Sequence, residues 1–212
     1  MGLGMSLRER IAKRAAEEIQ DGMVVNLGIG IPSLIPNFLL NKPRVMIQAE
    51  NGVLGIGPSP ALEKENEHLC NAAGYPVTLG KGASYFDSAL SFGMIRKGLI
   101  DMTILGSLQV SSGGDLANWI VPGRRVPGMG GAMELAQKAK RVIVLMNHTN
   151  KDGTPKIVNE CTLPLTARNC VNLIITEMAV MEITENGLCL KETLEPFTVE
   201  DVIKKTEASF FQ

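Results

Sequence analysis

The sequence predicts an α/β protein with an open, mostly parallel but mixed sheet and helices on both faces. Apolar strand-like runs alternate with helical patterns along the chain, as in parallel sheets covered on both sides. An Asn-Gly pair at 186–187 marks one antiparallel hairpin near the end. No linker, repeat or low-complexity tract interrupts the 212 residues. Residues 1–212 are therefore expected to form a single domain.

The first elements follow from local periodicity. Residues 6–20 carry apolar side chains four apart and end at Asp-Gly, which predicts an amphipathic helix. The apolar runs 23–30 and 44–50 predict strands that lead into glycine-rich turns. Between them, 31–40 predicts a helix with proline near its first turn. Residues 77–86 predict a short strand and turn.

In the middle of the chain, 88–98 predicts a helix that stops at glycine, and 101–110 a long apolar strand. Glycine, asparagine and proline then predict a loop through residue 131. Residues 132–140 predict a helix, and the apolar run 141–149 another strand.

The last third begins with a long β run over 172–184. The Asn-Gly turn separates it from the strand expected at 188–194. A Thr-x-x-Asp capping pattern starts the final helix, expected over 198–210.

Composition excludes several function classes. The net charge is −1 with a pI near 6.2, so no basic footprint for nucleic acid or an acidic membrane surface is present. The charged N-terminal helix pattern has no apolar segment, so neither a signal peptide nor a membrane span is expected. Four widely spaced cysteines without a C-x-x-C pair give no sign of secretion. A cytoplasmic protein with a small-molecule or protein partner is expected.

The turn NLGIGIP contains Gly28 and Gly30 between a strand and a helix, which is half of a dinucleotide fingerprint. The third glycine is missing, because Pro32 and Ser33 stand in its region. Two other interpretations remain: a tight strand-to-helix turn, or a backbone surface that a ligand approaches closely because glycine has no β-carbon.

QAENG places Glu50 where a buried strand emerges into a turn. A metal site is not expected, because His68 and His148 have no metal-ligand spacing. No G-x-S-x-G serine-hydrolase elbow occurs. Glu50 is left as a candidate covalent nucleophile, which its neighbours Asn51 and Gly52 leave accessible.

The sequence GMGG ends at Gly130 and Gly131, directly before an expected helix. Successive glycine N–H groups at a helix start form a concave donor site for an anion or a developing oxyanion. A tight turn without a ligand explains the same residues equally well.

These segments together resemble the β subunit of class I CoA-transferases, which act on 3-oxoacids and short-chain fatty acids. Ala49-Glu50-Asn51-Gly52 matches the Ser-Glu-Asn-Gly of the nucleophile motif. VNLGIGIP, GDLANWIVPG, GMGGAMEL, CTLPLTA and the closing TVEDVIKKTEA look like family segments in family order, from about residue 7 to about residue 210. Ala49 replaces the usual serine, and Lys97 and Leu99 stand where glycine and histidine are usual.

The resemblance implies a CoA-transferase-like fold and ping-pong transfer of CoA between a short-chain acyl-CoA and a carboxylic acid such as acetoacetate, butyrate, acetate or succinate. It assigns Glu50 as the nucleophile that forms a glutamyl-CoA thioester, and the N–H of Gly131, with Gly130, as an oxyanion donor. Asn51, Gly52, Gly28 and Gly30 are expected at the substrate and CoA site. No tightly bound cofactor or metal is expected, since CoA is both substrate and transient adduct.

The resemblance also implies a partner. The family's α subunit, which has a similar fold, is not part of this sequence, so a heterodimer or an α2β2 assembly is expected. Three alternatives stay open on the residues alone: a non-catalytic protein that binds acyl-CoA or a nucleotide, a sugar-phosphate isomerase using the turn GKGAS (80–84), and a dehydrogenase using NLGIG.

Overall fold

The computed structural model describes residues 5–123 and 128–212. The chain divides into two compact units. The first comprises the chain up to Leu105 together with Lys138–Lys140, and the second comprises 106–137 and 141–212. The single domain 1–212 stays a prediction. Within the described residues, no helix is long and apolar enough to cross a bilayer.

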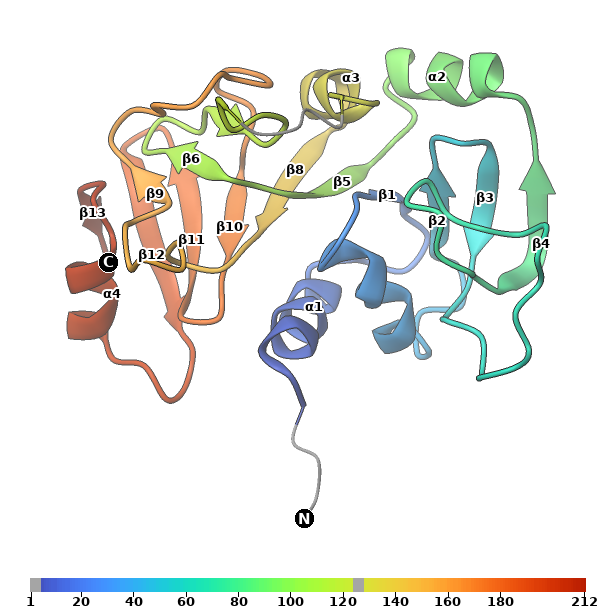
Figure 1. The fold of residues 1–212 in the computed structure, drawn as a ribbon, viewed down its shortest axis with the longest axis horizontal. Helices are drawn as coiled ribbons and strands as arrows, with labels where there is room; N and C mark the ends of the chain where they lie inside the picture. Colours follow the sequence, from blue (N-terminus) through green and yellow to red (C-terminus); the bar gives the residue numbers. More distant parts are fainter. Residues whose placement is uncertain (1–4, 124–127) are drawn as a thin grey trace. The chain divides into compact units, whose positions relative to one another are not determined.

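The first unit is built on five strands in the order β5-β1-β2-β3-β4 (Figure 1). Strand β1 pairs in parallel with both β2 and β5, whereas β3 and β4 are antiparallel additions at one edge. The parallel strands have mostly buried side chains, as expected for strands covered on both faces. The bounds of these strands are β1 Val24–Leu27, β2 Met46–Ala49, β3 Val53–Ile56, β4 Leu79–Tyr85 and β5 Met102–Gly106.

The described residues of this unit include three helices: α1 (Leu7–Glu17), the 3₁₀ helix η1 (Pro32–Phe38) and α2 (Ser88–Arg96). The expected helix at 31–40 forms as a 3₁₀ helix, and it contains Pro36, which has no N–H to donate within a helix. Because side chains alternate along β2, Gln48 points to the face that α2 covers, while its neighbours point to the other face.

The second unit contains five strands in the order β13-β12-β11-β10-β8 and a separate sheet β7-β6-β9. β10 pairs in parallel with β8, and the hairpin of β11 and β12 is antiparallel (Figure 1). The strands of this unit are β6 Gln109–Ser111, β7 Leu116–Ala117, β8 Arg141–Leu145, β9 Ile157–Val158, β10 Leu173–Ile175, β11 Ala179–Thr184, β12 Gly187–Thr193 and β13 Phe210–Phe211. The helices are α3 (Ala132–Lys138, of which 138 is assigned to the first unit) and α4 (Val199–Lys205).

The structure confirms the α/β class with a mixed sheet, the Asn-Gly hairpin and the capping of the final helix by Thr198. The expected extent of that helix, 198–210, is wrong: α4 ends at Lys205, and Phe210–Phe211 forms β13. Two long β runs were expected to be single strands, and this prediction is wrong. The run 101–110 is divided between β5 and β6, and the run 172–184 between β10 and β11. The second break occurs at Thr176, whose hydroxyl accepts hydrogen bonds from the Met178 and Ala179 N–H groups and closes a turn. The expected loop through residue 131 includes 124–127, which lie outside the described residues.

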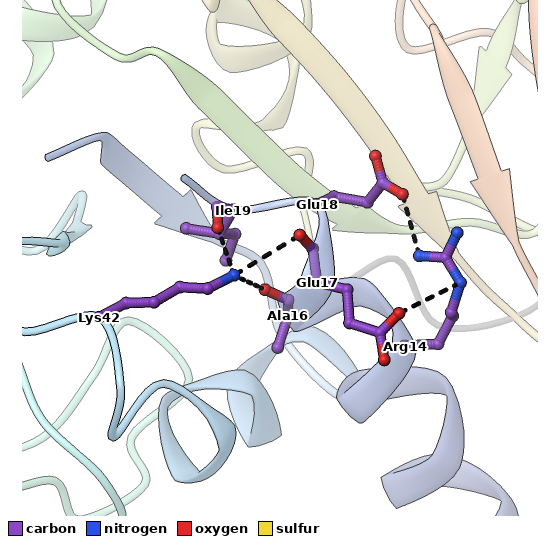
Figure 2. A network of polar contacts seen from close by, with 6 residues as sticks. All are labelled: Arg14, Ala16, Glu17, Glu18, Ile19 and Lys42. Carbon is purple, nitrogen blue, oxygen red and sulfur yellow. Dashed lines mark hydrogen bonds and ion pairs between the residues drawn. The ribbon is translucent and has the colours of Figure 1, made fainter. Parts of the chain in front are cut away.

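Lys42 closes the C-terminal end of α1 (Figure 2). Its ammonium donates to the backbone carbonyl of Ala16 at 2.7 Å and to those of Glu17 and Ile19. The last carbonyls of a helix have no partner within the helix, and they carry the negative end of its dipole. Lys42 therefore satisfies acceptors that would otherwise need water.

Replacing Lys42 with methionine (Lys42→Met) keeps the apolar stem and removes the charge. The free energy of unfolding is expected to fall by about 1–2 kcal/mol, because hydrogen bonds to carbonyl groups from a charged donor are lost. Urea denaturation followed by circular dichroism measures it. Arg44→Met is the matched control, since the Arg44 side chain is 79% exposed and its ion pair with Asp21 lies at the surface, where such pairs contribute little to stability. Equal losses in both variants would contradict this role of Lys42.

Candidate active site

Glu50 lies at the carboxyl end of β2, in a turn that a single glycine makes possible. The Gly52 N–H donates to the Ala49 carbonyl at 3.0 Å, and the Phe86 N–H donates to the Gly52 carbonyl at 3.0 Å. Gly52 has φ +112°, and a β-carbon there would lie 2.0 Å from the Phe86 oxygen. The turn is therefore packed directly against the segment before α2, and only glycine fits.

The Glu50 carboxylate is partly buried and has a buried hydrogen-bond donor. Its Oε2 accepts from Nδ2 of Asn26, on the neighbouring strand β1, at 3.3 Å. Asn26 is fully buried, and it is in register with Gln48 on β2 and Thr103 on β5. The carboxylate is thus held at the end of three adjacent parallel strands, where α/β sheets gather ligands.

Four buried side chains form a continuous chain of hydrogen bonds behind Glu50, which we call the polar ladder. The Thr103 hydroxyl donates to Asn26 Oδ1 at 3.3 Å, and Asn26 Nδ2 donates to Gln48 Oε1 at 2.7 Å. Gln48 Nε2 then donates to the Ser91 hydroxyl of α2 at 2.8 Å. All four residues are fully buried. Sequence reasoning missed them, although each interrupts an apolar run with one polar side chain.

The other residues predicted around Glu50 have different surroundings. Asn51 is exposed, and its side-chain amide donates to the Cys70 carbonyl at 3.0 Å. Gly28 packs against β5: its N–H donates to the Ile104 carbonyl, and a β-carbon would lie 3.3 Å from that oxygen. Packing thus explains Gly28. The substrate-binding roles of Asn51, Gly52, Gly28 and Gly30 stay predictions.

Gly130 and Gly131 belong to the second unit. Gly131 is buried at the start of α3, and its carbonyl accepts from the Leu135 N–H at 3.0 Å. Gly130 has φ +56° and open space where a β-carbon would be. Their positions agree with a turn that begins a helix, and the oxyanion role stays a prediction.

A cavity of about 410 Å³ lies within the first unit, and its walls are largely apolar. Ala49, next to Glu50, lines it together with Gly30, which has φ +93°. The exposed Arg8 also lines the cavity, and its Nη2 lies 3.6 Å from where a Gly30 β-carbon would be. This volume is within the range of about 300–1,000 Å³ found for ligand pockets. Apolar side chains of the wall include Leu27, Leu34, Ile47, Ile56 and Val77.

The most strongly shifted bases are in the second unit. Burial lowers the pKa of His148 to about 4, so the ring is neutral at pH 7. Its two ring nitrogens contact the hydroxyls of Thr176 and Thr206 at 3.0 and 2.8 Å. Burial also lowers the pKa of Lys156 to about 8, and its ammonium donates to the Ser107 carbonyl at 2.9 Å. Both residues therefore have structural partners within their own unit.

Comparison with known proteins places this geometry in a family. A family described as "Coenzyme A transferase" matches residues 8–205. A Bacillus subtilis protein, named as the β subunit of a probable coenzyme A transferase, is 65% identical over 208 residues, covering 98% of this chain and 96% of the relative. A second protein from that organism, named as one subunit of a probable succinyl-CoA:3-ketoacid coenzyme A transferase, is 51% identical over 203 residues, covering 96% and 94%.

A solved structure shows the same fold. The apoenzyme of an acyl-CoA transferase from Escherichia coli O157:H7 superimposes with a TM-score of 0.80 at 20% sequence identity. The match covers all of this chain and 43% of the other, longer chain. Since relatives with at least 51% identity are matched over nearly their full length, the chain belongs to the coenzyme A transferase family.

Proposed function

We propose that this subunit carries the nucleophile of a CoA-transferase that moves CoA between a short-chain acyl-CoA and a carboxylic acid. The observation that supports it best is the Glu50 carboxylate, held by a buried amide donor at the carboxyl end of a central strand. The 3-oxoacid class of substrate rests on the names of several relatives, and the acids themselves are part of the proposal.

The proposed reaction begins with attack of a Glu50 carboxylate oxygen on the thioester carbonyl. This forms a mixed anhydride and releases the CoA thiolate. The thiolate then attacks the glutamyl carbonyl, which expels the acyl group as a carboxylate and leaves a glutamyl-CoA thioester. A second carboxylate reverses both steps and leaves as the new acyl-CoA. Covalent capture thereby splits one difficult transfer into easier steps.

This cycle makes limited demands on acid–base groups. A carboxylate enters and a carboxylate leaves, so no net proton transfer is needed. Each tetrahedral intermediate requires oxyanion donors, and removing one oxyanion donor from a protease that forms such an intermediate costs about 3–4 kcal/mol. We assign that donor to Gly131, with Gly130. CoA acts as substrate and transient adduct, with no other tightly bound cofactor.

The working enzyme is proposed to contain a separate α subunit, as a heterodimer or an α2β2 assembly. The names of the two Bacillus subtilis relatives support this, because they describe subunits whose length this chain matches almost completely. The chain on its own is therefore expected to be inactive. Turnover of the isolated chain equal to that of the reconstituted pair would contradict the requirement.

The covalent intermediate provides the direct test. The chain is co-produced with its α subunit and incubated with acetoacetyl-CoA, and peptides are then analysed by mass spectrometry. The peptide containing Glu50 is expected to carry CoA in thioester linkage. Normal turnover by an enzyme in which that peptide never carries CoA would overturn the mechanism.

We also propose that the cavity beside Ala49 binds a part of acyl-CoA remote from the reacting carbonyl. Its apolar walls suit an uncharged part of the ligand, and Arg8 suits an anionic group such as a CoA phosphate. Binding energy from such a remote contact holds the substrate in place during the reaction.

Arg8→Met tests this use of the cavity. The KM for acyl-CoA is expected to rise about 5–10-fold with kcat nearly unchanged, because the charged contact is made equally before and during the reaction. Steady-state kinetics measure both constants. Lys13→Met, which removes an exposed cation from the same helix, is the control and should leave KM within about 2-fold. An unchanged KM in Arg8→Met would exclude the cavity from the substrate site.

A further inference from the structure

We infer that Thr103 is a positioning residue for Glu50 and acts through Asn26. The inference rests on the proposed function, because it concerns the same carboxylate. Thr103 does not touch Glu50. It donates to Asn26 Oδ1, and the other end of the same amide group donates to Glu50 Oε2. Thr103 therefore holds the Asn26 amide group at its Oδ1 end, while Nδ2 at the other end faces the nucleophile.

The acceptors around Asn26 make one orientation of its amide strongly preferred. Nδ2 faces three oxygens: Gln48 Oε1 at 2.7 Å, the Gln48 carbonyl at 3.3 Å and Glu50 Oε2 at 3.3 Å. Rotating the amide by 180° would place Oδ1 against all three acceptors. It would also break the hydrogen bond that the Thr103 hydroxyl donates to Oδ1.

The amide group of Gln48, the neighbour of Asn26 in the ladder, is also held in one orientation. Gln48 Nε2 donates to Ser91, so Gln48 Oε1 is the end that remains to accept from Asn26. Every hydrogen bond in the polar ladder therefore donates in the same direction, from Thr103 toward Ser91. All four side chains are fully buried, so removing one partner leaves another buried polar group unsatisfied. The hydrogen bonds of the ladder therefore depend on one another, and losing one weakens the rest.

The ladder and the Gly52 turn hold Glu50 through the same segment of chain. Phe86 contacts Gly52, and Ser91 ends the ladder five residues later, in α2. The Gly52 turn fixes the backbone at Glu50, and the hydrogen bond from Asn26 holds the carboxylate at Oε2. Because Asn26 binds Oε2, attack on the thioester falls to Oε1.

The experiment compares Thr103→Val with Thr103→Ser in the assembled two-subunit enzyme. Valine has nearly the same shape and no hydroxyl, whereas serine keeps the donor. Thr103→Val is expected to lower kcat about 10-fold, with KM for acyl-CoA unchanged, and to slow formation of the glutamyl-CoA adduct in a single turnover by a similar factor. Thr103→Ser is expected to retain both rates within about 2-fold. An adduct rate unchanged by Thr103→Val would overturn the inference.

Ile104→Val is the control for stability, because it removes a methylene from the next buried residue of β5 without touching the ladder. If kcat falls equally in Ile104→Val and Thr103→Val, the effect is general destabilisation and the inference fails. Whether the wild-type enzyme forms the CoA adduct distinguishes failure of this inference from failure of the proposed function. If the wild-type enzyme forms the adduct and Thr103→Val forms it equally fast, only the positioning role is refuted. If the wild-type enzyme turns over without forming the adduct, the mechanism itself is refuted.

Discussion

Glu50→Gln is expected to lower turnover of the assembled enzyme by at least about 10³-fold and to abolish the CoA adduct. The amide is nearly isosteric, and its carbonyl oxygen still accepts from Asn26, so the fold should be unaffected. It has no anionic oxygen to attack a thioester, and loss of a covalent nucleophile removes the whole route. Steady-state assays and mass spectrometry of the Glu50 peptide measure the two losses.

Two further variants sharpen this test. Glu50→Asp keeps the charge but withdraws the nucleophile by one methylene, and a displacement of about 1 Å costs on the order of 10²-fold in rate. Glu67→Gln neutralises an exposed carboxylate of the same unit and should retain full activity. A Glu50→Gln enzyme as active as Glu67→Gln would show that no covalent attack occurs at position 50.

Gly52→Ala is expected to cause the largest loss of stability among single substitutions near the site. The added β-carbon would lie 2.0 Å from the Phe86 oxygen, and alanine is strained at φ +112°. The turn must open to relieve the contact, so the free energy of unfolding should fall by more than about 3 kcal/mol. Thermal denaturation measures the loss, and turnover should fall with it because Glu50 moves.

Gly82→Ala is the matched control. Gly82 also has a positive φ, +83°, but a β-carbon there has open space around it. The control is therefore expected to show only the backbone strain, about 1 kcal/mol. Similar losses in both variants would mean that backbone conformation, and not the contact with Phe86, decides the effect at Gly52.

Glu50 could be found from the sequence because its signal is local. A carboxylate between a buried strand and a glycine turn is unusual, and its neighbours are adjacent in the chain. The polar ladder depends on register instead. Asn26 and Thr103 are 77 residues apart, and only the parallel pairing of β1 with β5 brings them together. One polar residue within each apolar strand was the available signal, and it does not reveal which partner it meets.

The sequence did not predict strand β3, because glycines lie within it and on both sides of it. The sequence from 52 to 57 predicts a glycine-rich turn, because glycine weakens a strand. In the structure, Gly55 has φ +91°, and a β-carbon there would lie 2.9 Å from the Ala83 Cα. Glycine at position 55 lets β3 approach β4 closely where the pairing of the two strands is irregular. Such a purpose becomes visible only once the neighbouring strand is known.

The shared register of Asn26, Gln48 and Thr103 has a consequence for how this sequence can diverge. A mutation that makes one of the three apolar leaves its neighbour with an unpaired donor or acceptor in the interior. Such a change carries a penalty until a second mutation compensates for it. Homologues should therefore either keep the trio or exchange its members together, and an alignment of many relatives would show these three columns varying jointly.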